Sequence, residues 1–212
     1  MDLQFYGADC VSLTYKGTRI VVDDNLVELG AKSVTRPGDV ALFTDPGAGG
    51  DAGASGAPAR LVFGGPGEYE VADVSITGIA VRAHVDESGK NATMFKLVVG
   101  DVSVLVTGHV YPELTDDELE AVGVVDLLVV PVGGNGYTVD PAGAMKLIKA
   151  IEPKLVVPTH YADKALKFPV PQQSLQDALK ELTVETKETV SKLRLKHGDL
   201  SDVTQVVILE KS

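Results

Sequence analysis

The segment 126–160 reads DLLVVPVGGNGYTVDPAGAMKLIKAIEPKLVVPTH, and it decides the fold class. Its two apolar runs, Asp126–Val132 and Leu155–Pro158, lack the alternation of half-exposed strands and are typical of strands buried on both faces. Between them, Asp140 caps a predicted helix over Ala142–Ile151, in which apolar residues recur at helical spacing. Buried strands covered by helices predict a layered α/β architecture.

The elements expected around this segment divide the chain into a strand-rich first half and a mixed second half. Runs of β-branched and aromatic residues separated by turn residues predict the early strands. These are Leu3–Tyr6, Val11–Tyr15, Thr18–Val22, Asp39–Phe43, Arg60–Phe63, Glu68–Val71, Val74–Ala83, Thr93–Val99 and Val102–Val106. Further on, we expect helices from Thr115 to about Val122 and over Gln172–Leu182, and strands over Val190–Leu195 and Thr204–Leu209. We expect residues 1–212 to form a single domain.

Composition narrows the class of partner and the compartment. The chain has 212 residues, with 30 Asp and Glu against 19 Lys and Arg, a net charge of −11. Such a chain would approach a nucleic-acid backbone or an anionic membrane against repulsion, so we expect neither partner. A small-molecule ligand or substrate stays open. Cys10 is the only cysteine, the N-terminus does not resemble a signal peptide, and no apolar run is long enough to span a membrane. We therefore expect a cytoplasmic protein; its oligomeric state stays open.

Three of the four histidines follow predicted strands. His84, His109 and His160 each stand where a strand has just ended. Because side chains at strand ends in α/β folds converge on the edge where ligands bind, these imidazoles are candidate metal ligands. A single histidine of this kind is more often a half-buried residue bonded to backbone, but three at similar positions favour a shared site.

Several stretches resemble one family. The runs Leu114–Gly123, Val125–Gly134, Tyr137–Pro141 and Ile151–Tyr161 are similar to the C-terminal half of metallo-β-lactamase-fold hydrolases, in the branch of ascorbate-lactonase-like, zinc-dependent enzymes. The stretches Gln4–Gly7, Ile20–Asp24, Gly65–Val71 and Val74–Ile79 resemble small bacterial members of that branch. The resemblance implies a four-layer αββα sandwich, here trimmed and with few helices in its N-terminal half.

The resemblance also places the family's metal motifs, which hold one or two ions. The aspartate that closes an early strand falls on Asp23, and the histidines of the third and fifth motifs fall on His84 and His160. His109 stands where the family has a bridging aspartate. The family's His-x-His-x-Asp-His motif is replaced by Asp45, Gly47, Gly49 and Gly50.

These departures change the expected chemistry. His84, His109 and His160, with Asp45, could form one altered site for zinc, nickel or iron, because three imidazoles and a carboxylate suit such ions. The alternative is a metal-free pseudoenzyme that binds a small ligand or a protein. The ordinary dinuclear hydrolase is the least favoured interpretation.

The stretch Gly47–Ala52 matches a dinucleotide-binding fingerprint. The glycines and proline that follow cannot continue as the helix that this fingerprint requires, so we interpret the stretch as a surface loop.

Overall fold

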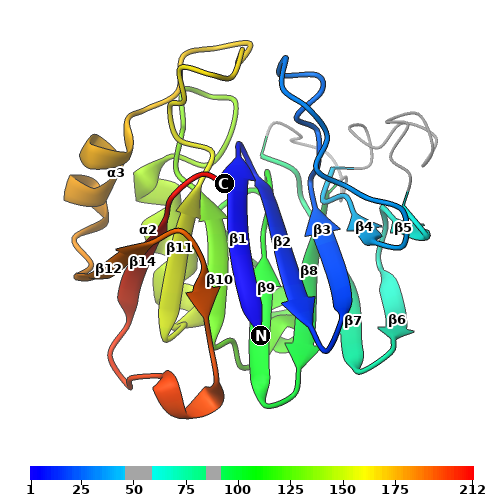
Figure 1. The fold of residues 1–212 in the computed structure, drawn as a ribbon. Coiled ribbons are helices and arrows are strands. Elements are labelled where there is room, and N and C mark those ends of the chain that lie inside the picture. The colour runs from blue at the N-terminus through cyan, green and yellow to red at the C-terminus, as the bar shows by residue number, and fades with distance from the viewer. Residues whose placement is uncertain (46–58, 85–91) are drawn as a thin grey trace.

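The computed structural model describes residues 1–45, 59–84 and 92–212, and its strands form two sheets packed face to face (Figure 1). The six-stranded sheet has the spatial order β13 (Leu193–Arg194), β1 (Asp2–Gly7), β2 (Cys10–Tyr15), β3 (Thr18–Val22), β4 (Val40–Leu42), β5 (Leu61–Phe63). The eight-stranded sheet has the order β12 (Thr186–Val190), β14 (Gln205–Leu209), β11 (Leu155–Thr159), β10 (Leu127–Pro131), β9 (Val102–Val106), β8 (Ala92–Val99), β7 (Val74–Val81), β6 (Gly67–Val71). The described helices are α1 (Asp116–Val122), α2 (Pro141–Ile151) and α3 (Leu175–Leu182).

The main core lies between the two sheets. Inward-facing residues such as Leu13 and Ile20 from one sheet join Phe95 and Val129 from the other in one cluster of buried apolar side chains. A second cluster joins the opposite face of the eight-stranded sheet to the helices, for example Leu128 to Leu147. This layering explains why buried and more exposed residues alternate in the antiparallel strands, and why every residue of β10 and β11 is buried. The expected α/β sandwich of metallo-β-lactamase type is therefore confirmed.

The outer face of the six-stranded sheet is covered differently. Cys10 and Val21 on this face pack against Leu26, Leu29 and Leu166, which lie in loops. Within the described ranges, loops take the place of a helical layer here, in agreement with the small number of helices expected in the N-terminal half. Cys10 is fully buried in this cluster, where it packs as a small apolar side chain.

Local sequence signals define the helix starts. The Thr115 hydroxyl accepts a hydrogen bond from the backbone of Glu118, whose side chain accepts one from the backbone of Thr115 in return. Asp140 accepts a hydrogen bond from Gly143 N at the start of α2. The predicted helix over Gln172–Leu182 begins later than expected, with Ser174 as its N-cap.

The prediction of one C-terminal strand over Val190–Leu195 is wrong. The structure instead has β12, which ends at Val190 and pairs with β14, and β13, which pairs with β1 in the other sheet. The residues of β12 are mostly exposed because it is an edge strand, so its sequence TKETV carries no apolar pattern.

No helix of the described ranges has the length and apolar character needed to cross a membrane. The interpretation of Gly47–Ala52 concerns residues outside the described ranges.

Parallel pairing aligns the strand ends that carry polar residues. Pro131 in β10 is in register with Thr159 in β11, and Val129 is in register with Val106 in β9. Residues that follow β9, β10 and β11 therefore emerge together at one edge of the eight-stranded sheet. The β1–β2 turn meets the same edge, because His160 N donates a hydrogen bond to Ala8 O.

Candidate metal centre

His109 reaches this edge of the sheet because the backbone just before it passes close to Thr44 at the end of β4. It follows Gly108, which has a φ of +63°, and a Cβ atom at Gly108 would lie 2.0 Å from the Thr44 hydroxyl oxygen. Only glycine allows the segment after β9 to pass so near to the end of β4. The His109 side chain is 26% exposed, so solvent and small molecules can reach it.

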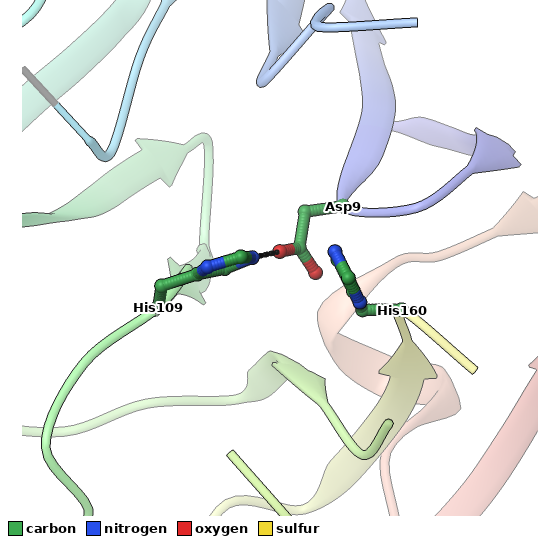
Figure 2. Close-up of side chains that lie close together, drawn as sticks. All are labelled: Asp9, His109 and His160. Atoms are coloured by element: carbon green, nitrogen blue, oxygen red, sulfur yellow. Dashed lines mark ion pairs between the residues drawn. The ribbon is translucent and has the colours of Figure 1, made fainter. Parts of the chain in front are cut away.

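His160 follows β11 and is almost completely buried. Its Nδ1 lies 3.2 Å from Gln172 Oε1, and the Gln172 amide nitrogen donates to Val170 O. Because that second bond orients the amide with its oxygen toward the ring, Nδ1 carries the proton and Nε2 has a free lone pair. Figure 2 shows a ring nitrogen of His160 turned toward the Asp9 carboxylate. A histidine held in one tautomer by a neighbouring acceptor is typical of metal ligands.

Asp9 lies in the turn between β1 and β2 and is also buried. Its Oδ1 accepts a 2.7 Å hydrogen bond from the Thr159 hydroxyl. Its Oδ2 forms an ion pair with His109, 2.9 Å from His109 Nε2 (Figure 2), and has no other partner within the described residues. A buried carboxylate oxygen with a single partner keeps a lone pair for a further one.

Asp9, His109 and His160 each offer one ligand atom, and these atoms lie within 4.8 Å of one another. Two ligands bound at about 2.0–2.1 Å to one tetrahedral ion stand about 3.4 Å apart. Binding of one ion would therefore require side-chain rotations that bring the three atoms closer together. One carboxylate oxygen and two imidazole nitrogens fit zinc or a similar transition metal.

The protonation states in this group depend on each other. Burial raises the pKa of Asp9, but the charge of His160, the hydrogen bond and charge of His109, and the Thr159 hydrogen bond outweigh it and lower that pKa overall. Burial lowers the pKa of His109, but contact with Asp9 and the charges of Asp23 and Asp45 raise it above its ordinary value. Burial dominates at His160 and lowers its pKa, so this ring releases a proton more readily than an ordinary histidine. A metal ion would therefore compete with a proton at His109 rather than at His160.

Asp23 forms a second buried carboxyl near the group. Its two oxygens accept hydrogen bonds from the backbone N and the hydroxyl of Thr44, at 2.8 and 2.7 Å. Burial and the charge of Asp9 raise the pKa of Asp23 to about 7, against the lowering effect of the Thr44 hydrogen bonds. Asp23 therefore changes charge near neutral pH.

The structure brings together two of the four ligands expected from the sequence and adds a third residue. His109 and His160 lie in the group, whereas His84 and Asp45 are outside the three-residue set. His84 N donates to His109 O, and its buried Nδ1 accepts or donates no hydrogen bond within the described part of the chain. Asp45 is exposed, and its charge acts on His109. Whether either residue binds the ion stays a prediction.

Sequence reasoning missed Asp9. An aspartate in a tight turn after Gly7 and Ala8 is the ordinary residue for such a turn, and nothing in its neighbours distinguishes it from one. Only the packing of the β1–β2 turn against β11 shows that the side chain points inward.

Comparison with known proteins identifies the family of this chain. A family model described as a beta-lactamase superfamily domain matches residues 2–160. A metal-dependent hydrolase of Carboxydothermus hydrogenoformans is 35% identical over 71 residues, which span 34% of this chain and 31% of that protein. One of Thermoplasma acidophilum is 40% identical over 47 residues, 21% of this chain and 20% of that protein. The matches thus span less than a third of these relatives' length.

Solved structures are similar over nearly the whole chain. A metallo-beta-lactamase superfamily protein of Thermotoga maritima, named as a Zn-dependent hydrolase, has a TM-score of 0.72 and 26% identity, covering 99% of this chain and 98% of that one. A metallo hydrolase of Ignicoccus hospitalis has a TM-score of 0.64 and 16% identity, with 99% and 95% covered, which shows the fold alone. Because the family model covers well over half of the residues, this chain belongs to the metallo-β-lactamase superfamily.

Proposed function

We propose that this protein binds one transition metal ion through Asp9, His109 and His160 and acts as a mononuclear metal-dependent hydrolase. The observation that carries the proposal is the buried carboxylate of Asp9, which Thr159 holds by one oxygen and which lies within ligand distance of two imidazoles from separate strand ends. The family membership and the relatives named as metal-dependent hydrolases support it. When bound, such an ion acts as a Lewis acid and lowers the pKa of a coordinated water toward 7.

The residues of the chain prepare the site for this role. Gln172 fixes the tautomer of His160, and Thr159 holds one oxygen of Asp9 so that the other faces the imidazoles. Asp9 supplies a negative charge that offsets part of the charge of a divalent cation. The partial exposure of His109 leaves the group accessible to a substrate.

The alternative, a metal-free binding module, has one observation in its favour. The 2.9 Å contact between Asp9 and protonated His109 forms an ion pair that balances the buried charge without metal. The second imidazole beside the same carboxylate, that of His160, favours the metal-bound state.

Metal analysis of untagged protein, after zinc reconstitution and removal of free ion, tests the proposal. We expect about one equivalent of zinc, and near loss of metal in D9N, H109A and H160A variants that retain the circular dichroism of the parent. H84A and D45N should keep the metal if the three residues are sufficient; loss in either would enlarge the ligand set. Less than about a tenth of an equivalent in the parent protein would contradict the proposal.

A further inference from the structure

An asparagine–glycine pair forms an exposed turn between β10 and α2. Tyr137 N donates a 3.2 Å hydrogen bond to Gly134 O, which closes the turn over residues 134–137. The two central residues, Asn135 and Gly136, have φ values of +56° and +73°. Asparagine followed by glycine is the sequence that such a turn favours, because both residues tolerate positive φ. Both residues are exposed to solvent.

The backbone nitrogen of Gly136 is accessible to reaction. It donates no hydrogen bond to any residue that the structure describes. A Cβ atom built at Gly136 would meet no atom within 4 Å, so the space around the residue is open. Glycine also lets the backbone rotate into the geometry in which this nitrogen attacks the side-chain carbonyl carbon of the residue before it.

The side chain of Asn135 helps to hold a neighbouring segment of the chain. Its Nδ2 donates a hydrogen bond to Pro171 O. Close by, Gln173 N donates a 2.8 Å hydrogen bond to Gly133 O. Gln172 lies between these two bonds, and a Cβ atom at Gly133 would stand 2.2 Å from Gln172 Oε1. The segment that contains Asn135 therefore supports Gln172 directly.

We propose that Asn135 is a site of spontaneous deamidation, and that its conversion to a carboxylate weakens the candidate metal centre. Gly136 N loses its proton to a solvent base and bonds to the side-chain carbon of Asn135. The bond from that carbon to Nδ2 breaks, and ammonia leaves. Water then opens the five-membered succinimide at either carbonyl, which gives aspartate or isoaspartate. One water is consumed and one ammonia is released, with no oxidation or reduction.

The carboxylate changes the contact with Pro171. It has no N–H to donate, so its oxygen faces the Pro171 carbonyl oxygen, and two acceptors repel each other. Pro171 precedes Gln172, whose Oε1 lies 3.2 Å from Nδ1 of His160, so a shift of this segment loosens the orientation of the ring. This second step rests on the proposed function, whereas the deamidation itself does not.

Peptide mapping by mass spectrometry tests the modification. The full-length protein is aged in mildly alkaline buffer, which promotes loss of the Gly136 N–H proton, beside a free peptide of residues 131–140. We expect the fragment that contains Asn135 to gain about 1 Da, more slowly in the protein because the folded turn restrains it. Asn25 is the internal control, since it is half-buried and leucine follows it. No gain at Asn135 once the free peptide has converted, or an equal gain at Asn25, would overturn the proposal.

The N135D variant carries the side chain of the product and tests the effect on the metal centre. We expect its zinc affinity to fall by about threefold to tenfold, less than for a direct partner of His160, because Asn135 acts through Gln172. N135A removes the donor without adding a charge, so it should lose less affinity than N135D. Unchanged zinc affinity in N135D would contradict the second step.

A measurement without metal separates this inference from the proposed function. The ring-nitrogen chemical shifts of His160, assigned by their loss in H160Q, are compared in parent and N135D protein treated with a chelator. We expect the shifts of N135D to move toward those of mixed tautomers. If they move while the parent binds no zinc, the proposed function fails and the role of Asn135 stands. If the parent binds zinc and N135D changes neither the shifts nor the affinity, the effect of deamidation on the centre is overturned alone.

Discussion

The Thr159 hydroxyl donates a 2.7 Å hydrogen bond to Asp9 Oδ1, joining residues that are 150 positions apart. Both side chains are buried, and the bond connects the end of β11 to the β1–β2 turn of the other sheet. The adjacent backbone bond from His160 N to Ala8 O holds the same two segments together. One oxygen of Asp9 is thus fixed by the fold, and the other faces the imidazoles.

The T159V variant tests this arrangement. It keeps the side-chain shape but leaves Asp9 Oδ1 without its donor in a buried place, so we expect the free energy of unfolding to fall by about 1–3 kcal/mol. Zinc affinity should fall as well, because Asp9 is less firmly oriented. Urea denaturation in a chelator and a competitive zinc titration measure the two effects.

Thr138 provides the matched control for that variant. It is equally buried, but its hydroxyl has no hydrogen-bond partner within the described residues. T138V should therefore leave stability unchanged or raise it, since an unsatisfied polar group is removed. Equal destabilisation by T138V and T159V would show that the bond to Asp9 has no special role.

Gln172 is expected to act through His160. Q172L removes the acceptor at Nδ1, so the ring loses its preferred tautomer, and we expect zinc affinity to fall by about tenfold to a hundredfold. Q172E restores an acceptor and should recover most of the affinity. The control is Q173L, because the neighbouring Gln173 side chain bonds to exposed Glu181 instead. Full affinity in Q172L would mean that packing alone orients His160.

The sequence predicts the central part of the fold well because the signals there are local. The continuous apolar runs of β10 and β11 and the capped, periodic α2 lie where the pattern indicates. The edge strand β12 could not be found in this way, because pairing with β14 and not side-chain burial holds it in the sheet.

The site was only partly predictable for a related reason. His109 and His160 are chemically distinctive and stand at strand ends, so position in the sequence identifies them as candidates. Asp9 comes from the opposite sheet, and its inward orientation depends on contacts with Thr159 and Ala8 that join distant parts of the chain. A single sequence contains no signal for such a long-range contact.

The Asp9–His109 pair makes stability and metal binding respond to pH in opposite directions. The raised pKa of His109 gives the metal-free protein stability that is complete below the unfolded pKa of about 6.5 and is lost as pH rises through the folded pKa. The lowered pKa of Asp9 gives stability that is lost as pH falls through the folded value. The metal-free protein should therefore lose this contribution above neutral pH, while zinc affinity rises because the proton on His109 is released.

Thermal denaturation in a chelator and zinc titration across pH 6 to 9, on the parent and on H109Q, measure these trends. The glutamine variant has no proton to lose at this position, so its stability should change less over that range. A parent protein whose zinc affinity does not change with pH would contradict protonation of His109 in the metal-free state.

Asp23 should contribute a second loss of stability with rising pH, over a lower pH range than His109. Its pKa is raised from 3.8 to about 7 in the folded protein, so the parent loses stability as pH rises between these values, while unfolded Asp23 ionises and folded Asp23 does not. In D23N the amide oxygen can still accept from Thr44 N, and its NH₂ can donate to the Thr44 hydroxyl. The variant therefore keeps two bonds and carries no buried charge. Measured by urea denaturation in a chelator, its stability relative to the parent should increase by about 1–4 kcal/mol from pH 4 upward and level off above pH 7. A constant difference across this range would mean that Asp23 ionises in the folded protein as it does in the unfolded chain.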